Sequence, residues 1–448
     1  MPDRRLGLAA LLLATPASAR TELTIPRYDE DWSTLADPAA HTGTWTDALR
    51  YIPLDDHSYL TTGIELRLRN EAFRDNLWGG GPAPDDGYVW LRALPYADLH
   101  VGAVRGFVQP ILGYAIGVAP SAGPIDQTRA DLLQAFADVT LPLGETRINL
   151  RGGRELLSLG TERLIGTRYG PNVPLAFDGL RAIMRYRGLT LDLLRVRPAQ
   201  PGRASFDDRA SRSKRLSGAY ASGPGLDAYW LDYRNDRAVF ASGAGAERRT
   251  SIGLRGFGTR GDWHWNIEGI VQRGRFATQR IRAWSVGSEV GYAFSATRLK
   301  PTLTMRLNIV SGDRKAGDAT LGTFNALFPK GKYFGELSPV GPYNIVNANP
   351  GVALDLGGGV SAGLMAEAYW RYARGDGVYD VPGTLIRAPG TSRARAVGKQ
   401  IEALIGWQAT PELALSASLS AFDAGAFLRE TGPARTIVMI GLEANYRF

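Results

Sequence analysis

The chain has 448 residues, of which 44% are hydrophobic and 21% are charged, and it contains 54 Gly, 26 Pro and no Cys. This apolar share is too high for a disordered chain, and the lack of cysteine excludes disulfides, thiolate metal sites and cysteine nucleophiles. The mean hydropathy of −0.16 is too polar for a bundle of membrane helices. The net charge is +8, and 46 of the 52 basic residues are arginine. The guanidinium of arginine binds a carboxylate or a phosphate through two parallel hydrogen bonds, so the excess of arginine favours anionic partners. A GC-rich genome also enriches arginine.

Residues 1–19 are typical of a secretory signal peptide. Arg4 and Arg5 form a basic start, a short apolar run follows, and Ala17-Ser18-Ala19 resembles a cleavage site. The apolar run is shorter than the roughly 18 residues that a membrane-spanning helix needs. We therefore expect an exported protein whose mature chain begins at Arg20; the alternative is a buried amino-terminal helix.

Residues 20–58 show no clear alternation of apolar and polar residues. We predict that they form an amino-terminal arm, which the sequence allows to be a periplasmic extension, a plug or a cover for a sheet edge.

Residues 59–448 alternate between apolar and polar side chains in long segments. Trp263, Trp265, Ile267 and Val271 share one face of such a segment, for example, while His264 and the other even-numbered residues share the opposite face. A strand places successive side chains on opposite faces, so each segment is predicted to be a strand with one apolar and one polar face. Gly, Pro, Asp and Asn separate the segments.

Three features favour a membrane barrel over a soluble β-sandwich. The segments are about 9–12 residues long, which suits a tilted membrane strand better than the usual soluble strand. Aromatic residues gather near strand ends, as in Trp263 with Trp265 and Tyr446 with Phe448. The polar faces also carry charges, which a watery lumen tolerates and a dry core does not. We predict an all-β fold, a transmembrane antiparallel barrel of about 18 strands with long loops, although the chain length also allows 16.

Several ordered blocks of the sequence resemble the alginate export family of outer-membrane β-barrels. The most specific block runs from Gly153-Arg154-Glu155 through Gly170-Pro171-Asn172-Val173 to Phe177-Asp178-Gly179-Leu180-Arg181, and a later block includes Ser311-Gly312-Asp313 and Tyr333-Phe334-Gly335. One departure is Thr62-Gly63-Ile64-Glu65, which lacks an expected double glycine. The resemblance implies an 18-stranded barrel and passage of a polyuronate such as alginate through an arginine-lined constriction.

The polar faces of the predicted strands carry the first group of candidate pore residues. Alternation points these arginines into the lumen, where clustered cations attract anions and speed their entry. Pairing with glutamates across strands is the alternative role. The candidates are Arg67, Arg69, Arg147, Arg151, Arg181, Arg185, Arg187 and Arg306.

Two long segments without alternation, 154–178 and 311–354, are predicted to be loops that fold into or over the pore. Arg154, Arg163 and Arg168 are the candidate constriction residues, and Asn172 and Asp178 are expected to position them. An ordinary exposed loop is the alternative.

We expect an outer-membrane channel with an anion-selective lumen, and a general anion-preferring porin for small solutes is the main alternative. A barrel enzyme or an adhesin is less well supported, because apparent motifs such as Gly256-Phe257-Gly258-Thr259-Arg260-Gly261 lie in alternating strands instead of before a helix. We predict no catalytic residues, no cofactor and no metal. The expected partners are outer-membrane lipid and lipopolysaccharide, an anionic saccharide and an optional periplasmic protein, with no nucleic acid, and we expect a monomer.

Overall fold

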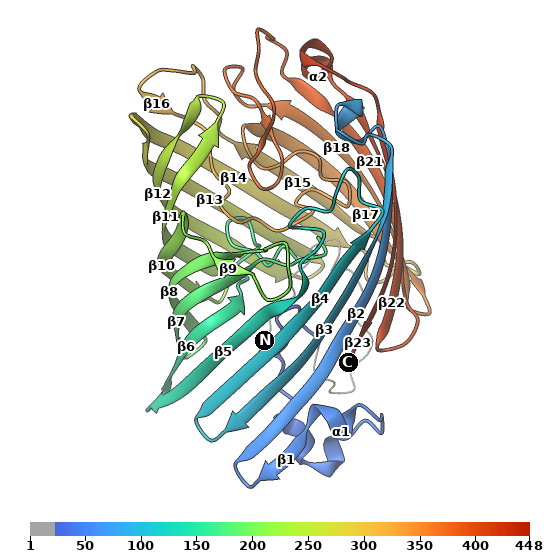
Figure 1. The fold of residues 1–448 in the computed structure, drawn as a ribbon. Helices are drawn as coiled ribbons and strands as arrows, with labels where there is room; N and C mark the ends of the chain where they lie inside the picture. Colours follow the sequence, from blue (N-terminus) through green and yellow to red (C-terminus); the bar gives the residue numbers. More distant parts are fainter. Residues whose placement is uncertain (1–22) are drawn as a thin grey trace.

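Eighteen long antiparallel strands form the wall of a closed barrel in the computed structural model, which describes residues 23–448 (Figure 1). The barrel closes where the first wall strand pairs with the last, with Arg67 opposite Asn445. The predicted signal peptide and its predicted cleavage site lie outside the described residues. The wall strands are β2 (Ser58–Arg74), β3 (Asp86–Val101), β4 (Val104–Ile116), β5 (Arg129–Leu143), β6 (Thr146–Leu156), β7 (Ala176–Tyr186), β8 (Leu189–Gln200), β10 (Lys214–Gly223), β11 (Leu226–Phe240), β12 (Gly243–Arg260), β13 (Trp263–Phe276), β14 (Gln279–Ala293), β15 (Thr302–Val310), β17 (Ile345–Gly357), β18 (Val360–Arg371), β21 (Ala396–Gln408), β22 (Leu413–Ala424) and β23 (Ile437–Arg447).

The wall has the apolar exterior and polar interior that the alternation predicts. On β15, Leu303, Met305 and Leu307 face outward and are 43–48% exposed, while Asn308 faces the lumen and is buried. The strands are between 9 and 18 residues long, which is enough for each to cross a bilayer at a tilt. The predicted barrel class and strand number are confirmed.

The two ends of the barrel differ in the length of their connections. At one end the connections are short, and Gly261, at φ 59°, forms one of these turns in a conformation that glycine adopts readily. The long loops gather at the other end, where Figure 1 shows several of them bending into the barrel. Short turns are periplasmic and long loops extracellular in outer-membrane barrels. The amino-terminal arm therefore lies at the periplasmic end.

Two predicted loops are shorter than expected. The strand β6 continues to Leu156 and β7 begins at Ala176, so the first loop spans 157–175 and not 154–178. The second spans 311–344 and not 311–354, because β17 begins at Ile345. Strand pairing extends beyond the alternating stretch in each case, since backbone hydrogen bonds do not require an apolar side chain. We call 157–175 and 311–344 the lumen loops.

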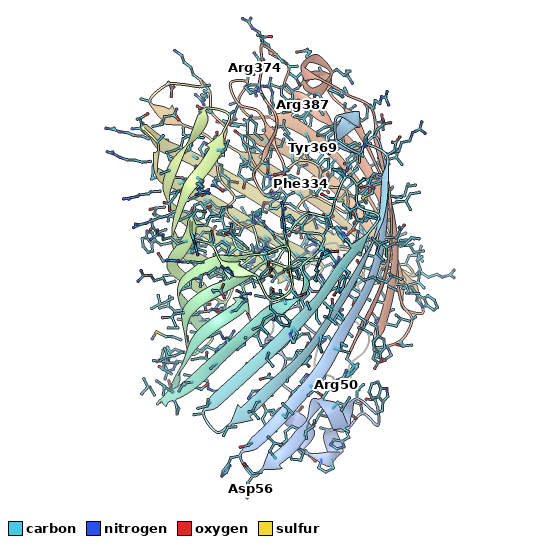
Figure 2. The ribbon with its side chains drawn as sticks, in the orientation of Figure 1. Arg50, Asp56, Phe334, Tyr369, Arg374 and Arg387 are labelled. Carbon is cyan, nitrogen blue, oxygen red and sulfur yellow. The ribbon has the colours of Figure 1, made fainter. Side chains whose placement is uncertain are left out.

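The arm, residues 23–57, consists of short elements; its later part lies beneath the barrel (Figure 1), whereas its start around Tyr28 enters the lumen. Figure 2 places Arg50 and Asp56 at this end of the molecule, opposite Arg374 and Arg387. None of the helices in residues 23–448 is both long and apolar enough to cross a membrane. The arm contains η2 (Arg27–Asp29), η3 (Ser33–Ala36), η4 (Pro38–Ala40), α1 (Asp47–Arg50) and β1 (Ile52–Asp55). The loop elements are η5 (Asn76–Gly79), β9 (Arg209–Ala210), β16 (Thr320–Leu321), β19 (Val378–Tyr379), β20 (Leu385–Arg387) and α2 (Ala426–Thr431).

Candidate functional site: the barrel lumen

The lumen face of the first strand takes part in a cluster of paired charges. Arg69 contacts three carboxylates: Glu71 at 2.6 Å, Glu443 at 2.7 Å and Glu336 at 2.5 Å. Lys332 contacts Glu71 at 2.9 Å and Glu336 at 2.7 Å. Burial would raise the pKa of Glu336, but Lys332 and Arg69 outweigh it and hold that pKa well below its usual range. Because Glu336 and Lys332 belong to the second lumen loop, the cluster ties that loop to the wall.

Arg67 holds the first lumen loop by its backbone. Its guanidinium donates hydrogen bonds to the carbonyl oxygens of Tyr169 and Gly170 at 2.9 and 2.7 Å. The neighbouring Arg92 donates to the carbonyl of Pro171 at 3.0 Å and pairs with Glu65 at 2.7 Å. These two arginines therefore use much of their bonding capacity to hold the loop inside the barrel.

Asn172 anchors the same loop to the wall. Its side-chain Nδ2 donates to the carbonyls of Leu91, Tyr114 and Asp126 at 2.9–3.2 Å. The prediction that Asn172 positions the loop arginines is wrong, because its side-chain hydrogen bonds go to these backbone carbonyls. A side-chain amide can donate several hydrogen bonds, and the fully buried Asn172 is surrounded by backbone carbonyls that accept them.

A second cluster lies on β5–β8, where Arg151 and Arg181 share Glu155. Arg151 forms a two-pronged pair with Asp138 at 2.7 and 2.8 Å and contacts Glu155 at 2.8 Å. Arg181 contacts Glu155 at 3.1 Å and Asp192 at 2.7 Å. Both arginines face the lumen as alternation predicts, but their guanidinium groups are already paired with carboxylates.

Arg154 and Asp178 lie on facing strands instead of in a loop. The strand register places them directly opposite each other, and Arg154 Nε donates to Asp178 Oδ1 at 2.8 Å. Asp178 therefore holds Arg154, as predicted, although both belong to the wall.

Three other predicted pore residues lie near the periplasmic rim. Arg147 and Arg185 face each other across β6 and β7 and are exposed there. The prediction that Arg187 points inward from a strand is wrong. The strand β7 ends at Tyr186, so Arg187 lies in the exposed turn, where it pairs with Glu145 at 2.5 Å.

The two lumen loops meet inside the barrel. The backbone N–H of Gly166 donates to the carbonyl of Phe328 at 2.8 Å, and the N–H of Phe328 donates to the carbonyl of Leu164 at 2.9 Å. The Phe328 ring packs edge-on against Phe177 and Tyr233 of the wall, with ring centroids 5.2 and 5.6 Å apart. The loops thus fill part of the lumen with a folded apolar core.

The same core extends along the second loop. Figure 2 places Phe334 and Tyr369 inside the barrel, and their rings meet edge-on at 5.3 Å.

The meeting point of the lumen loops gathers cationic side chains. Arg163 donates to Asn308 and Tyr333 at 2.7 and 3.1 Å and lies 3.2 Å from Glu268. Arg168 donates to the carbonyl of Pro329 at 3.3 Å. These contacts place both predicted loop arginines in the lumen.

Lys330 joins this group, although the sequence reasoning did not select it. Burial, aided by nearby Arg306 and Arg163, lowers the pKa of Lys330 to about 8. Among residues 23–448, neither Lys330 nor Arg168 has a carboxylate oxygen within 4.0 Å. Arg306, from the wall, is paired with Glu289 at 2.5 Å. Arg168 and Lys330 are therefore two cations here that remain free to meet an anion.

A group of three carboxylates is the one candidate metal cluster within the described residues. Ligand atoms of Asp131, Asp207 and Asp208 lie within 4.8 Å of one another. Backbone N–H groups already donate to Asp131 and to Asp207, and Thr128 donates to Asp208. We assign no metal to this group, because hydrogen bonds within the chain account for its geometry.

The second lumen loop meets the loop 372–395 where the backbone N–H of Asp313 donates to Asp376 Oδ2 at 2.9 Å. Burial, with nearby Asp376 adding to it, raises the pKa of Asp313 to about 6. Because the raised pKa favours the protonated form in the folded loops, this contact should tighten as pH falls from 7.5 through 6. We expect fewer opening and closing events at pH 5 than at pH 7.5 in single-channel recordings. The variant Asp313→Asn should lose most of this pH dependence, and an unchanged dependence in that variant would contradict the assignment.

The fold and the site define an outer-membrane channel protein of the porin class. The sequence model of the alginate export family matches residues 58–438, and the chain belongs to this family. None of the curated proteins compared with the chain matches it in sequence.

Similar solved structures come from Pseudomonas aeruginosa and show the fold. OpdO has a TM-score of 0.59 at 13% identity and covers 87% of this chain and 97% of its own. OccK2 (OpdF), solved with glucuronate, has a TM-score of 0.57 at 13% identity, with 87% and 96% covered. OpdK, solved with vanillate, has a TM-score of 0.56 at 14% identity, with 86% and 98% covered.

Proposed function

We propose that the protein passes an anionic saccharide, a polyuronate or its oligosaccharides, across the outer membrane. The observation that carries this proposal is the meeting point of the lumen loops, where Arg168 and Lys330 have no carboxylate partner among residues 23–448. Cations at a narrow point attract anions, and weak, repeated contacts let a polymer leave again. Membership of the alginate export family supports this cargo.

The paired arginines then have a different role from the one first expected. Arg69, Arg151 and Arg181 are neutralised by carboxylates, so they set the shape of the lumen more than they attract cargo. Arg69 also holds the second lumen loop through Glu336. We propose that anion selectivity comes mainly from the loop cations, and that the protein works as a passive monomeric channel without catalytic activity.

A channel for small organic acids is the second candidate. It is favoured by the two similar structures solved with glucuronate and with vanillate, both of which are small carboxylates. Such acids need fewer successive contacts than a polymer does.

A planar-bilayer experiment separates these functions. We expect an anion-selective reversal potential in a salt gradient, and current block by uronate oligosaccharides but not by neutral oligosaccharides of equal length. The variant Arg168→Gln/Lys330→Gln should weaken both effects, with about a tenfold loss of block for two charges in a site that excludes bulk water.

The variant Arg260→Gln/Lys399→Gln is the matched control, because it also removes one arginine and one lysine but from exposed positions on the outer face. Block by glucuronate alone, with oligosaccharides inert, would favour the small-acid channel. Equal selectivity in all three proteins would contradict the role of the loop cations.

A further inference from the structure

A row of arginines crosses the outer face of the wall on five neighbouring strands, β10–β14. Each lies directly opposite the next in the strand register, and all five side chains are exposed. Figure 2 shows nitrogen-tipped side chains projecting outward from this side of the barrel, near its extracellular end. The members of this arginine row are Arg215, Arg234, Arg248, Arg275 and Arg280.

Like charges directly opposite each other on neighbouring strands repel, so this row is unfavourable unless an anion lies beside it. A second opposed pair, Arg273 with Arg282, lies one step toward the periplasm. Among residues 23–448, these seven arginines make one contact with a carboxylate. It joins Arg234 to Asp232 at 3.5 Å. The lumen arginines just described contrast with them, because most have a carboxylate at 2.5–2.8 Å.

The arginine row lies at the extracellular boundary of the band of apolar side chains that surrounds the outside of the barrel. On β13, the outward side chains are apolar or glycine from Trp263 to Val271, and Arg273 and Arg275 follow. This stretch of nine residues agrees with the roughly 9–11 that a tilted strand needs to cross a bilayer. The arginines therefore begin where the hydrocarbon ends, on the side of the long loops.

Four of these side chains also line one depression in the outer surface. Arg273 and Arg275 border it on β13, and Arg280 and Arg282 border it on β14. Four guanidinium groups around one hollow offer paired donors to phosphate oxygens.

We propose that the arginine row and the Arg273–Arg282 pair bind the phosphate groups of lipopolysaccharide in the outer leaflet. Lipopolysaccharide carries phosphates next to its acyl chains, which is the height at which the row lies. The row faces the bilayer and not the lumen, so cargo inside the channel does not meet it. Each arginine near an anionic lipid surface strengthens binding about fivefold.

Native mass spectrometry of the full mature barrel in detergent tests this site. The probes are lipid A with two phosphates, with one and with none, together with inorganic phosphate. We expect retention to rise with the number of phosphates, and no retention of inorganic phosphate at the same concentration. The variant Arg275→Gln/Arg280→Gln should lower the affinity for bisphosphorylated lipid A about 25-fold.

The variant Arg260→Gln/Arg298→Gln is the control, since it removes two exposed arginines at the periplasmic end. Equal losses in the two variants, or retention that ignores phosphate number, would overturn the proposal. Tight binding of inorganic phosphate alone would replace the lipid with a free anion and would also overturn it. If the double variant does not fold, Arg248→Gln gives the same comparison, with an expected loss of about fivefold.

Discussion

Replacing Arg27 and Tyr28 with alanine is expected to open the periplasmic mouth of the channel and to raise its conductance severalfold. Tyr28 enters the lumen, where its hydroxyl donates to the carbonyl of Leu156 at 2.5 Å and its ring packs edge-on against Phe107 and Phe136. Arg27 donates to the carbonyl of Phe448, the last residue of the chain, at 2.9 Å.

Arg27 thus ties the arm to the seam between β2 and β23, and Tyr28 ties it to β4, β5 and β6 inside the barrel. Truncating a buried aromatic side chain typically costs about 3–5 kcal/mol, which is enough to release a short arm. Conductance and its noise in planar bilayers measure the release, and heat denaturation of the barrel shows whether the wall stays intact. The control is Asp56→Ala, an exposed position at the same end. An unchanged conductance with a released arm would show that the arm does not narrow the mouth.

The alternation of side chains made the barrel predictable, because it follows directly from strand geometry. It assigns Arg69, Arg151 and Arg181 to the lumen, where the structure has them. Their partners could not be predicted, since these depend on cross-strand register. Asp138 meets Arg151 because the hairpin between them turns in two residues, Gly144 and Glu145.

The contact between the lumen loops was even less accessible to sequence reasoning. Leu164 and Phe328 are far apart in the chain, and neither loop has a repeating pattern that indicates a partner. The outward arginines, in contrast, left a signal that went unused. Arg248 and Arg249 are adjacent in a strand, so one of them had to face outward.

Replacing Arg249 with methionine is expected to loosen the second lumen loop and to destabilise it by about 3–5 kcal/mol, because a buried carboxylate loses its partner. Arg249 and Glu247 are fully buried in the lumen and 2.5 Å apart. Arg249 also donates to the loop carbonyl of Thr323 at 3.1 Å, and Asn325 of the loop donates to Glu247 at 3.1 Å. The pair thus joins β12 to the loop.

The double variant Glu247→Gln/Arg249→Met should recover much of the loss, since removing both charges leaves no uncompensated ion in the lumen. The control is Arg248→Met, the same substitution one residue earlier on the outer face, which should leave the loop unchanged. Hydrogen exchange of the loop amides measures the loosening, and channel recordings should show larger and more frequent openings in Arg249→Met alone. If both arginine variants behave alike, the loop is held mainly by its apolar core around Phe328, and charge pairing contributes little to closing the channel.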